Sequence, residues 1–241
     1  LIGGKQDSGK VFYDFSITKN VFAMLLSVIF MLIIFIGMGR SYKNSLMPKG
    51  AGRILEPIVI FIRDEVAIPN IGSSKYKRFM PYLLTVFFFI WINNLFGLIP
   101  FFPFGGNLTG NIAITAVLAI ITLLITLFSA NKDYWKHIFM PPVPILLYPI
   151  MVPIEIIGVF TKPFALMMRL FANVTAGHIM ILAIISLIFI FKSPLLGFAS
   201  VPLALFISVL ELLVAVLQAY IFTVLSALFI GIAVQDHSHE H

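Results

Sequence analysis

The C-terminal part of the chain carries few ionisable side chains, and their types suit the transfer of protons. Between Pro141 and Val234 they are Glu155, Lys162, Arg169, Lys192, Glu211 and one histidine, His178. An arginine is always charged, and at the centre of a bilayer it costs about 2.5–3.5 kcal/mol even on the most lenient scale. Ionisable groups in apolar tracts usually mark an ion pathway, although a buried ion pair that locks two helices together is the alternative.

The spacing of these residues separates the arginine from groups that can titrate. On an ideal helix, with about 100° per residue, Asn173 lies ~40° from Arg169, so the two share a face. His178 lies about 180° away from Arg169 and ~13 Å further along the axis, so it points into a different space. Glu155 lies ~40° off and ~21 Å back along the same axis.

The chemistry of the side chains then indicates which ion is carried. In the last apolar tract, Glu211 and Gln218 are seven residues apart and share a face within about 20°. A histidine changes its charge close to neutral pH and a carboxyl group can accept and release a proton, so His178, Glu155 and Glu211 can pass protons. Arg169 cannot, because its guanidinium does not release one. The pattern indicates an electrostatic gate between two proton paths.

The elements that position these residues must lie in a membrane. Hydrophobic residues make up 60% of the 241 residues and charged residues 11%, and the mean hydropathy is +1.06. A soluble domain carries about 25% charged residues, so the composition indicates an integral membrane protein. Long apolar runs favour a helical bundle over a β-barrel, whose strands would alternate. The absence of cysteine excludes disulfides and thiolate metal sites.

The N-terminal third of the chain sets the predicted topology. Residues 1–18 are polar and are predicted to form an outer tail, and 19–39 form a first span. The loop 40–78 is rich in lysine and arginine, so the positive-inside rule places it inside and the N-terminus outside. The net charge of +6 arises largely from this loop. We interpret these charges as determinants of topology and expect no nucleic-acid partner.

One helix is predicted within the basic loop. Its apolar residues cover most of the helix surface, and its charged residues recur at offsets that place them on one face. Two interpretations are equally open, a helix lying in the membrane surface and an ordinary amphipathic loop helix. The charged positions are Arg53, Glu56, Arg63 and Asp64.

A two-helix hairpin is predicted over 79–130, followed by an inner loop over 131–142. Within the hairpin, Asn93 and Asn94 either line a hydrated path or hydrogen-bond to a neighbouring helix, and the second is favoured. Together with the flanking elements the hairpin belongs to one membrane domain that includes the whole chain.

Two exceptionally long apolar tracts complete the chain, over 143–191 and 195–234, before an inner tail at 235–241. As single helices they would be about 74 and 60 Å long, whereas the hydrocarbon layer is about 30 Å thick. Each tract must therefore fold into two spans or cross the membrane at an extreme tilt. For the His-rich tail, a solvated segment is favoured over a metal site. The start at Leu1 fits either a removed leader peptide or a sequence that begins late.

Two of these stretches carry a family resemblance. "TKPFALMMRLFANVTAGHIMI", followed by "LELLVAVLQAYIFTVLSALFI", closely resembles the a-subunit of rotary, proton-translocating F-type ATP synthases. The resemblance runs from about Tyr13 to the end of the chain and includes "NLTGNIAITAVLA". Its most specific element is the Arg-Leu-Phe-x-Asn core at 169–173, combined with Gln218 in the final tract.

The resemblance implies an all-α integral membrane protein with about five crossing helices and one interfacial amphipathic helix. The last two helices would be very long and strongly tilted along a rotor, with the C-terminus inside. The implied partners are the c-ring of the rotor, b-type subunits of the peripheral stalk, the lipid bilayer and protons. The subunit would be a non-catalytic part of the stator, without a cofactor. We expect the bacterial inner membrane, with the mitochondrial inner membrane as the alternative.

The resemblance also assigns roles to single positions. Arg169 would face the rotor carboxylates as the gate. The outer half-channel would contain His178, Glu211, Asn173 and Gln218, and the inner half-channel would contain Glu155. Some bacterial members carry Glu at the position of His178 and His at that of Glu211, so the pair is exchanged here, as in mitochondrial members. Gly97 stands where some members carry an aspartate, so no proton role is expected there.

Overall fold

The computed structural model describes residues 19–44, 51–98, 108–141, 143–144, 147–191 and 194–234. The predicted outer tail, the His-rich tail and Lys192 lie outside the described residues. The described part is built from helices: α1 (Lys19–Asn44), α2 (Ala51–Phe61), the π-helical segment η1 (Ile62–Ala67), α3 (Ile68–Ile71), α4 (Tyr76–Leu98), α5 (Ile112–Ser129), α6 (Lys132–Phe139), α7 (Tyr148–Phe191) and α8 (Pro194–Val234).

Five of these helices are long and apolar enough to cross a membrane. The candidate spans are Asn20–Arg40, Tyr76–Leu98, Ile112–Ser129, Tyr148–Phe191 and Ser200–Val234. The all-α membrane class predicted from the sequence is therefore confirmed.

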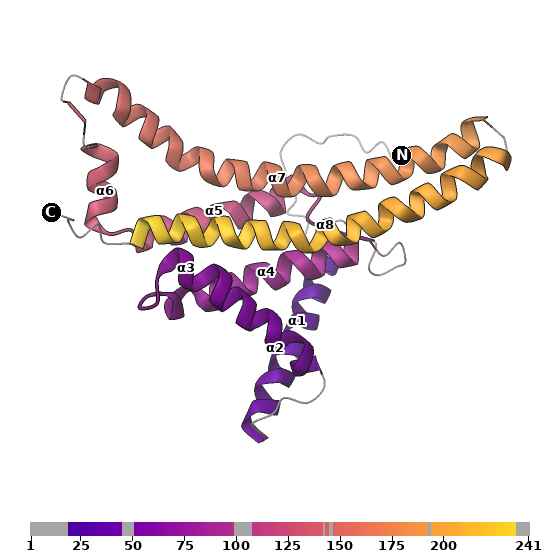
Figure 1. Ribbon diagram of the computed structural model, residues 1–241, viewed down its shortest axis with the longest axis horizontal. Coiled ribbons are helices and arrows are strands. Elements are labelled where there is room, and N and C mark those ends of the chain that lie inside the picture. Colours follow the sequence, from indigo (N-terminus) through magenta and orange to yellow (C-terminus); the bar gives the residue numbers. More distant parts are fainter. Residues whose placement is uncertain are drawn as a thin grey trace, which may run out of the picture.

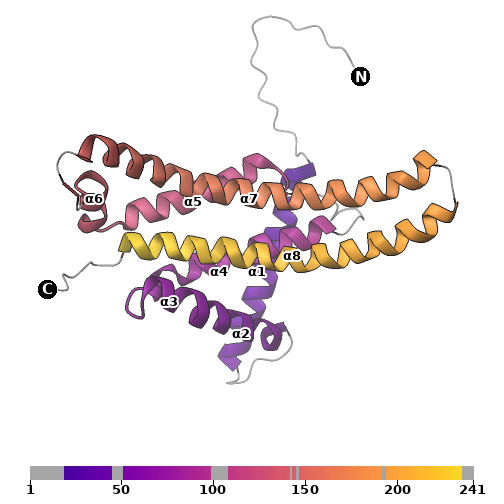
Figure 2. The ribbon, with the colours of Figure 1, turned by 45° about the horizontal axis from the view of Figure 1, so that its top comes forward.

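The two longest helices lie side by side and organise the molecule (Figure 1). α8 contacts α7 on one side and α4 on the other, and α5 contacts both α7 and α8. The short helix α6 joins the end of α5 to the start of α7, as Figure 2 also shows. α1 crosses the direction of the long pair steeply and contacts α4 and α2. α7 therefore presents one side to α8 and α5 and leaves the other side open.

The apolar tracts at the C-terminal end form continuous helices. α7 has 44 residues and α8 has 41, which corresponds to about 66 and 62 Å. Pro153 and Pro163 lie within α7 and Pro202 within α8, and none of them ends its helix. Of the two arrangements that the sequence left open, the pair of single long helices is the one found. A helix of this length can stay within a hydrocarbon layer of about 30 Å only at a strong tilt.

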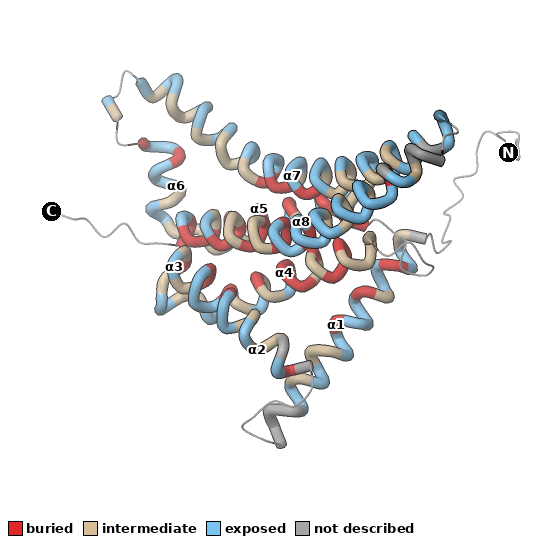
Figure 3. The backbone as a smooth tube through the Cα atoms, turned by 45° about the vertical axis from the view of Figure 1, so that its right-hand side comes forward, coloured by how far each residue is buried: buried red, intermediate tan, exposed pale blue. Residues whose placement is uncertain are grey.

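The core lies where α4 and the C-terminal half of α8 meet (Figure 3). Phe88 and Leu83 of α4 and Phe222 of α8 are fully buried there. α5 adds a buried threonine face, and Thr122 Oγ1 lies 2.7 Å from the hydroxyl of Tyr82 on α4 in a hydrogen bond. This packed region forms the rigid base against which α7 lies.

The predicted amphipathic helix of the basic loop is the run α2–η1–α3. Ile62, Val66 and Ile71 on its apolar side are buried in the core, and the run contacts α4 and α8. On its outer side Arg63 and Asp64 form an exposed ion pair of 2.7 Å, and the hydrogen bond from Arg63 lowers the pKa of the Asp64 carboxyl. The apolar side of this run is thus buried against the protein itself.

Residues 132–139 form helix α6, although the segment 131–142 was expected to be a loop. Its neighbour Asn131 connects this region to the end of α8. The Asn131 side chain donates to the Val234 carbonyl at 2.7 Å, and Lys75 Nζ donates to the same oxygen at 2.8 Å. A cation and an amide donor at a helix C-terminus offset the free carbonyls and the negative end of the helix dipole.

Gly231 of α8 allows α3 to pass close to the backbone of α8. A Cβ atom at this position would overlap the backbone carbonyl of Asn70, which a helix cannot move without shifting as a whole. We expect Gly231→Ala to destabilise the subunit by roughly 1–3 kcal/mol, the usual cost of overpacking. The measurement is the amount of subunit in membranes and the thermal stability of the solubilised complex. Gly37→Ala on α1, where a Cβ would meet nothing within 4 Å, is the matched control, and equal behaviour of both variants would contradict the expectation.

Candidate functional site

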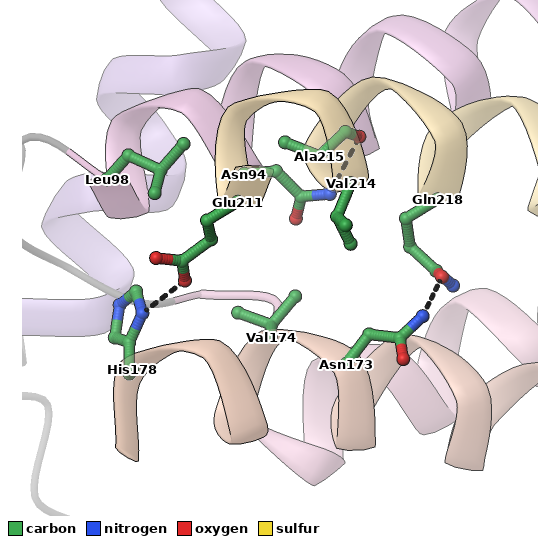
Figure 4. A pocket seen from close by; sticks show the side chains of 9 residues that line it. All are labelled: Asn94, Leu98, Asn173, Val174, His178, Glu211, Val214, Ala215 and Gln218. Carbon is green, nitrogen blue, oxygen red and sulfur yellow. Dashed lines mark hydrogen bonds and ion pairs between the residues drawn. The ribbon is translucent and has the colours of Figure 1, made fainter. Parts of the chain in front are cut away.

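The histidine and glutamate that the sequence singled out meet between α7 and α8. His178 Nδ1 lies 3.0 Å from Glu211 Oε1 (Figure 4). The side chains are 31% and 11% exposed, respectively. Gly177 packs directly against the Glu211 carboxylate, and a Cβ at that position would collide with it. A larger residue here would displace the carboxylate, which is the movable end of its side chain, from its present position beside His178.

A second polar pair lies further along the same two helices. Asn173 Nδ2 of α7 donates to Gln218 Oε1 of α8 at 2.5 Å. Gln218 is only 1% exposed, whereas Asn173 is on the exposed side of α7. The sequence had placed Glu211 and Gln218 on one face of their helix, and both turn to α7 here (Figure 4).

A small cavity connects the two pairs. It offers about 20 Å³ to the centre of a water molecule, which is room for about one. Glu211 Oε2 and Gln218 Nε2 are buried without a hydrogen-bond partner among the described residues. Buried polar atoms of this kind are usually satisfied by water. The lining residues are Asn94, Leu98, Asn173, Val174, His178, Glu211, Val214, Ala215 and Gln218.

Asn94 belongs to this site, and both interpretations that the sequence left open for it apply. Its Nδ2 donates to the Ala215 carbonyl of α8 at 3.2 Å, and its Oδ1 accepts from Thr109 Oγ1 at 2.7 Å. The interhelical hydrogen bond is the interpretation that the sequence favoured, and Asn94 lines the cavity as well. An amide inside an apolar span was the available signal. Its neighbour Asn93 bonds to the Phe89 carbonyl of its own helix at 2.6 Å.

Arg169 lies on the open side of α7, away from this cavity. It is exposed, and its guanidinium makes no ion pair or hydrogen bond with another described residue. Its neighbours on the same helix include exposed apolar side chains, among them Phe164 and Met168. The separation of Arg169 from His178 that helical geometry predicted is therefore present in the structure.

Glu155 lies near the start of α7, on the far side of Arg169 from His178. It is half-buried, and the neighbouring helix α6 brings Tyr134 close to it. Burial raises the pKa of the Tyr134 phenol, and the negative charge of Glu155 raises it further. Along the helix, 14 residues separate Glu155 from Arg169, or about 21 Å. The structure thus keeps the two titratable regions apart, with the arginine between them.

The chain is similar in sequence to known proteins over almost its full length. A family model described as ATP synthase A chain matches residues 21–231. The chain belongs to the ATP synthase subunit a family. It is 50% identical over 238 residues to ATP synthase subunit a of Chloroherpeton thalassium, an alignment that covers 95% of this chain and 70% of that protein. It is 45% identical over 240 residues to the Myxococcus xanthus subunit, with 95% and 78% covered.

Membership of the subunit a family confirms the resemblance found in the sequence. It makes the chain a membrane component of an ATP synthase, which agrees with the five apolar helices. In the described part of the chain no group of three or more His, Asp or Glu residues is arranged to hold a metal ion, and the His-rich tail lies outside that part.

Proposed function

We propose that this subunit is the proton channel of the stator, with two offset half-channels separated by Arg169. The observation that carries the proposal is the arrangement of α7. The His178–Glu211 pair and a water-sized cavity lie on its α8 side, whereas the exposed guanidinium of Arg169 lies on its open side. Ionisable groups inside a membrane are costly, and a pathway for ions is their usual use.

In the outer half-channel, His178 and Glu211 pass a proton between them, because an imidazole and a carboxyl group can each accept and release one. Asn173, Gln218 and Asn94 line the cavity beside the pair and bind the water that would link it to the open side of α7. The proton neutralises a carboxyl group on the c-ring, which can then move into lipid without the cost of a charge.

In the inner half-channel, the same rotor carboxyl arrives near Glu155 and releases its proton. Arg169 stabilises the charged form of that carboxyl and opposes the direct passage of a proton from one half-channel to the other. The subunit itself makes no bond in ATP, so it is a non-catalytic partner of the c-ring and of b-type stalk subunits. Its relatives are bacterial, which favours the bacterial inner membrane over the mitochondrial one.

Glu155→Gln tests the inner half-channel. The substitution keeps the shape of the side chain and removes its ability to carry a proton, so we expect proton flux to fall about 100-fold, the lower end of the usual contribution of a proton-transfer group. The complex should still assemble with its ring, because Glu155 forms no ion pair with another described residue. The measurement is ATP-driven proton pumping by the whole complex in lipid vesicles.

The matched control is Glu65→Gln on η1, which makes the same change at an exposed position of the run α2–η1–α3. It should leave proton flux unchanged. Normal flux in the Glu155 variant would show that this residue only packs or solvates the end of α7.

A further inference from the structure

Lys162 is a cation of the membrane domain to which neither half-channel assigns a role. It lies seven residues after Glu155 and seven before Arg169, so the three residues follow one slowly drifting stripe of α7. Lys162 is half-buried, unlike Arg169. Its Nζ lies 5.8 Å from the centre of the Phe229 ring on α8, which is within the range of a cation–π contact.

The ammonium lines a second cavity, on the side of the molecule where Glu155 lies. This cavity offers about 10 Å³ to the centre of a water molecule, the lower limit for holding one. Four helices contribute to it. The lining residues are Thr122, Leu123 and Thr126 of α5, Tyr134 of α6, Val159, Lys162 and Pro163 of α7, and Phe229 of α8.

The charges around Lys162 are few. From α6 the lining includes the Tyr134 phenol, which is neutral near pH 7, and α5 and α8 contribute no ionisable group to it. On α7 itself the nearest charges along the stripe are Glu155 and Arg169. Lys162 makes no ion pair with another described residue. The effect of Glu155 on Tyr134 shows that the field of this carboxylate reaches the wall of the same cavity.

We propose that Lys162 is a positioning residue of the inner half-channel, whose fixed charge favours the release of protons that pass between Arg169 and Glu155. This inference rests on the proposed function. A cation favours the charged form of a nearby carboxyl group. For a carboxyl group about two helical turns from the ammonium, at an effective dielectric constant near 20, the pH at which the proton is released falls by about 1 unit. The ring of Phe229 attracts the ammonium, which favours a position of the charge at the wall of the cavity.

The test is the dependence of ATP synthesis on the pH of the inner side, measured with the whole complex in vesicles. Outer pH is fixed, and the membrane potential is adjusted to keep the total driving force constant. Lys162→Gln should make release of the proton on the inner side harder. As the inner pH is lowered, the rate of ATP synthesis should therefore fall to half at a pH about 1 unit higher than in the unmodified complex. Lys162→Met serves as a second neutral variant in case the first assembles poorly.

Two controls separate charge from packing. Lys162→Arg keeps the charge and the ring contact, so its pH profile should coincide with that of the unmodified complex. Lys136→Gln removes a cation from the exposed side of α6 and should leave the profile in place. A loss of rate by the same factor at every pH in the neutral variants, or an equal shift in Lys162→Arg, would overturn the inference.

The failure of this inference can be told from failure of the proposed function in the same vesicles. If Arg169→Ala abolishes synthesis while Lys162→Gln follows the unmodified profile, only the role of Lys162 is wrong. If Arg169→Ala still synthesises ATP, the proposed gate is wrong. The inference about Lys162 then falls with it, because it assumes that the gate separates the two half-channels.

Discussion

Arg169→Ala should abolish ATP synthesis driven by a proton gradient and still allow passive proton leakage. The guanidinium is exposed on the open side of α7, where the proposed function places a rotor carboxylate. Two opposite unit charges about 5 Å apart, at an effective dielectric constant near 20, attract each other by roughly 3 kcal/mol. Its loss should therefore reduce synthesis by about 100-fold or more, because the rotor carboxyl no longer favours its charged form at the boundary between the half-channels.

The leak arises from the second role of the same charge. In the proposed gate, Arg169 repels a proton that would cross directly from the His178 side to the Glu155 side, and alanine would remove that barrier. Synthesis and passive leak should be measured in the same vesicles, with the amount of assembled subunit determined in each preparation. Substantial synthesis by an assembled Arg169→Ala complex would refute the gate and leave Arg169 as a costly structural residue.

Arg169→Lys is the matched variant for the shape of the cation. Lysine keeps one charge but loses the planar fork and the permanent protonation of the guanidinium. We expect synthesis to fail in this variant too, with less leakage than in Arg169→Ala because a charge remains.

Much of this fold follows from the sequence because a membrane restricts what a chain can do. An apolar run without water to satisfy its backbone must be helical, so an all-α class with about five crossing helices could be predicted from the sequence. The angular separation of Arg169 and His178 also followed from helical geometry alone. Single long helices could not be separated from two-span hairpins by length, since Pro153 and Pro163 permit either a break or a continuous helix.

Other features depend on contacts between distant parts of the chain. The cavity beside Glu211 requires Asn94 from α4 to reach across to α8, and no periodicity within one helix reports such a crossing. Helix α6 is short, and its single buried residue is Ile138, so its pattern is too weak to distinguish it from a loop. The roles of His178, Glu211, Asn173, Gln218, Glu155 and Arg169 remain predictions that the variants described for them test.

The exchange of His178 and Glu211 is the sharpest test of the outer half-channel. The two groups lie 3.0 Å apart, so the charge on either one acts directly on the other. His178→Glu alone places two carboxyl groups face to face, and Glu211→His alone places two imidazoles there. Each single change opposes the charged form of its neighbour, and we expect proton flux to fall by about 10-fold or more.

The double variant, His178→Glu with Glu211→His, restores one acid and one base across the same gap. Proton flux should therefore recover in part, because the arrangement of charge matters more to a relay than the helix that carries the carboxyl group. Recovery should be incomplete, since Gly177 is fitted to the Glu211 carboxylate and an imidazole at position 211 must find room against it. Glu211→Gln, which keeps the shape and removes the titration, is the control and should not be rescued by His178→Glu to the level of the exchange. If the double variant conducts no better than the worse single variant, His178 and Glu211 do not act as one relay.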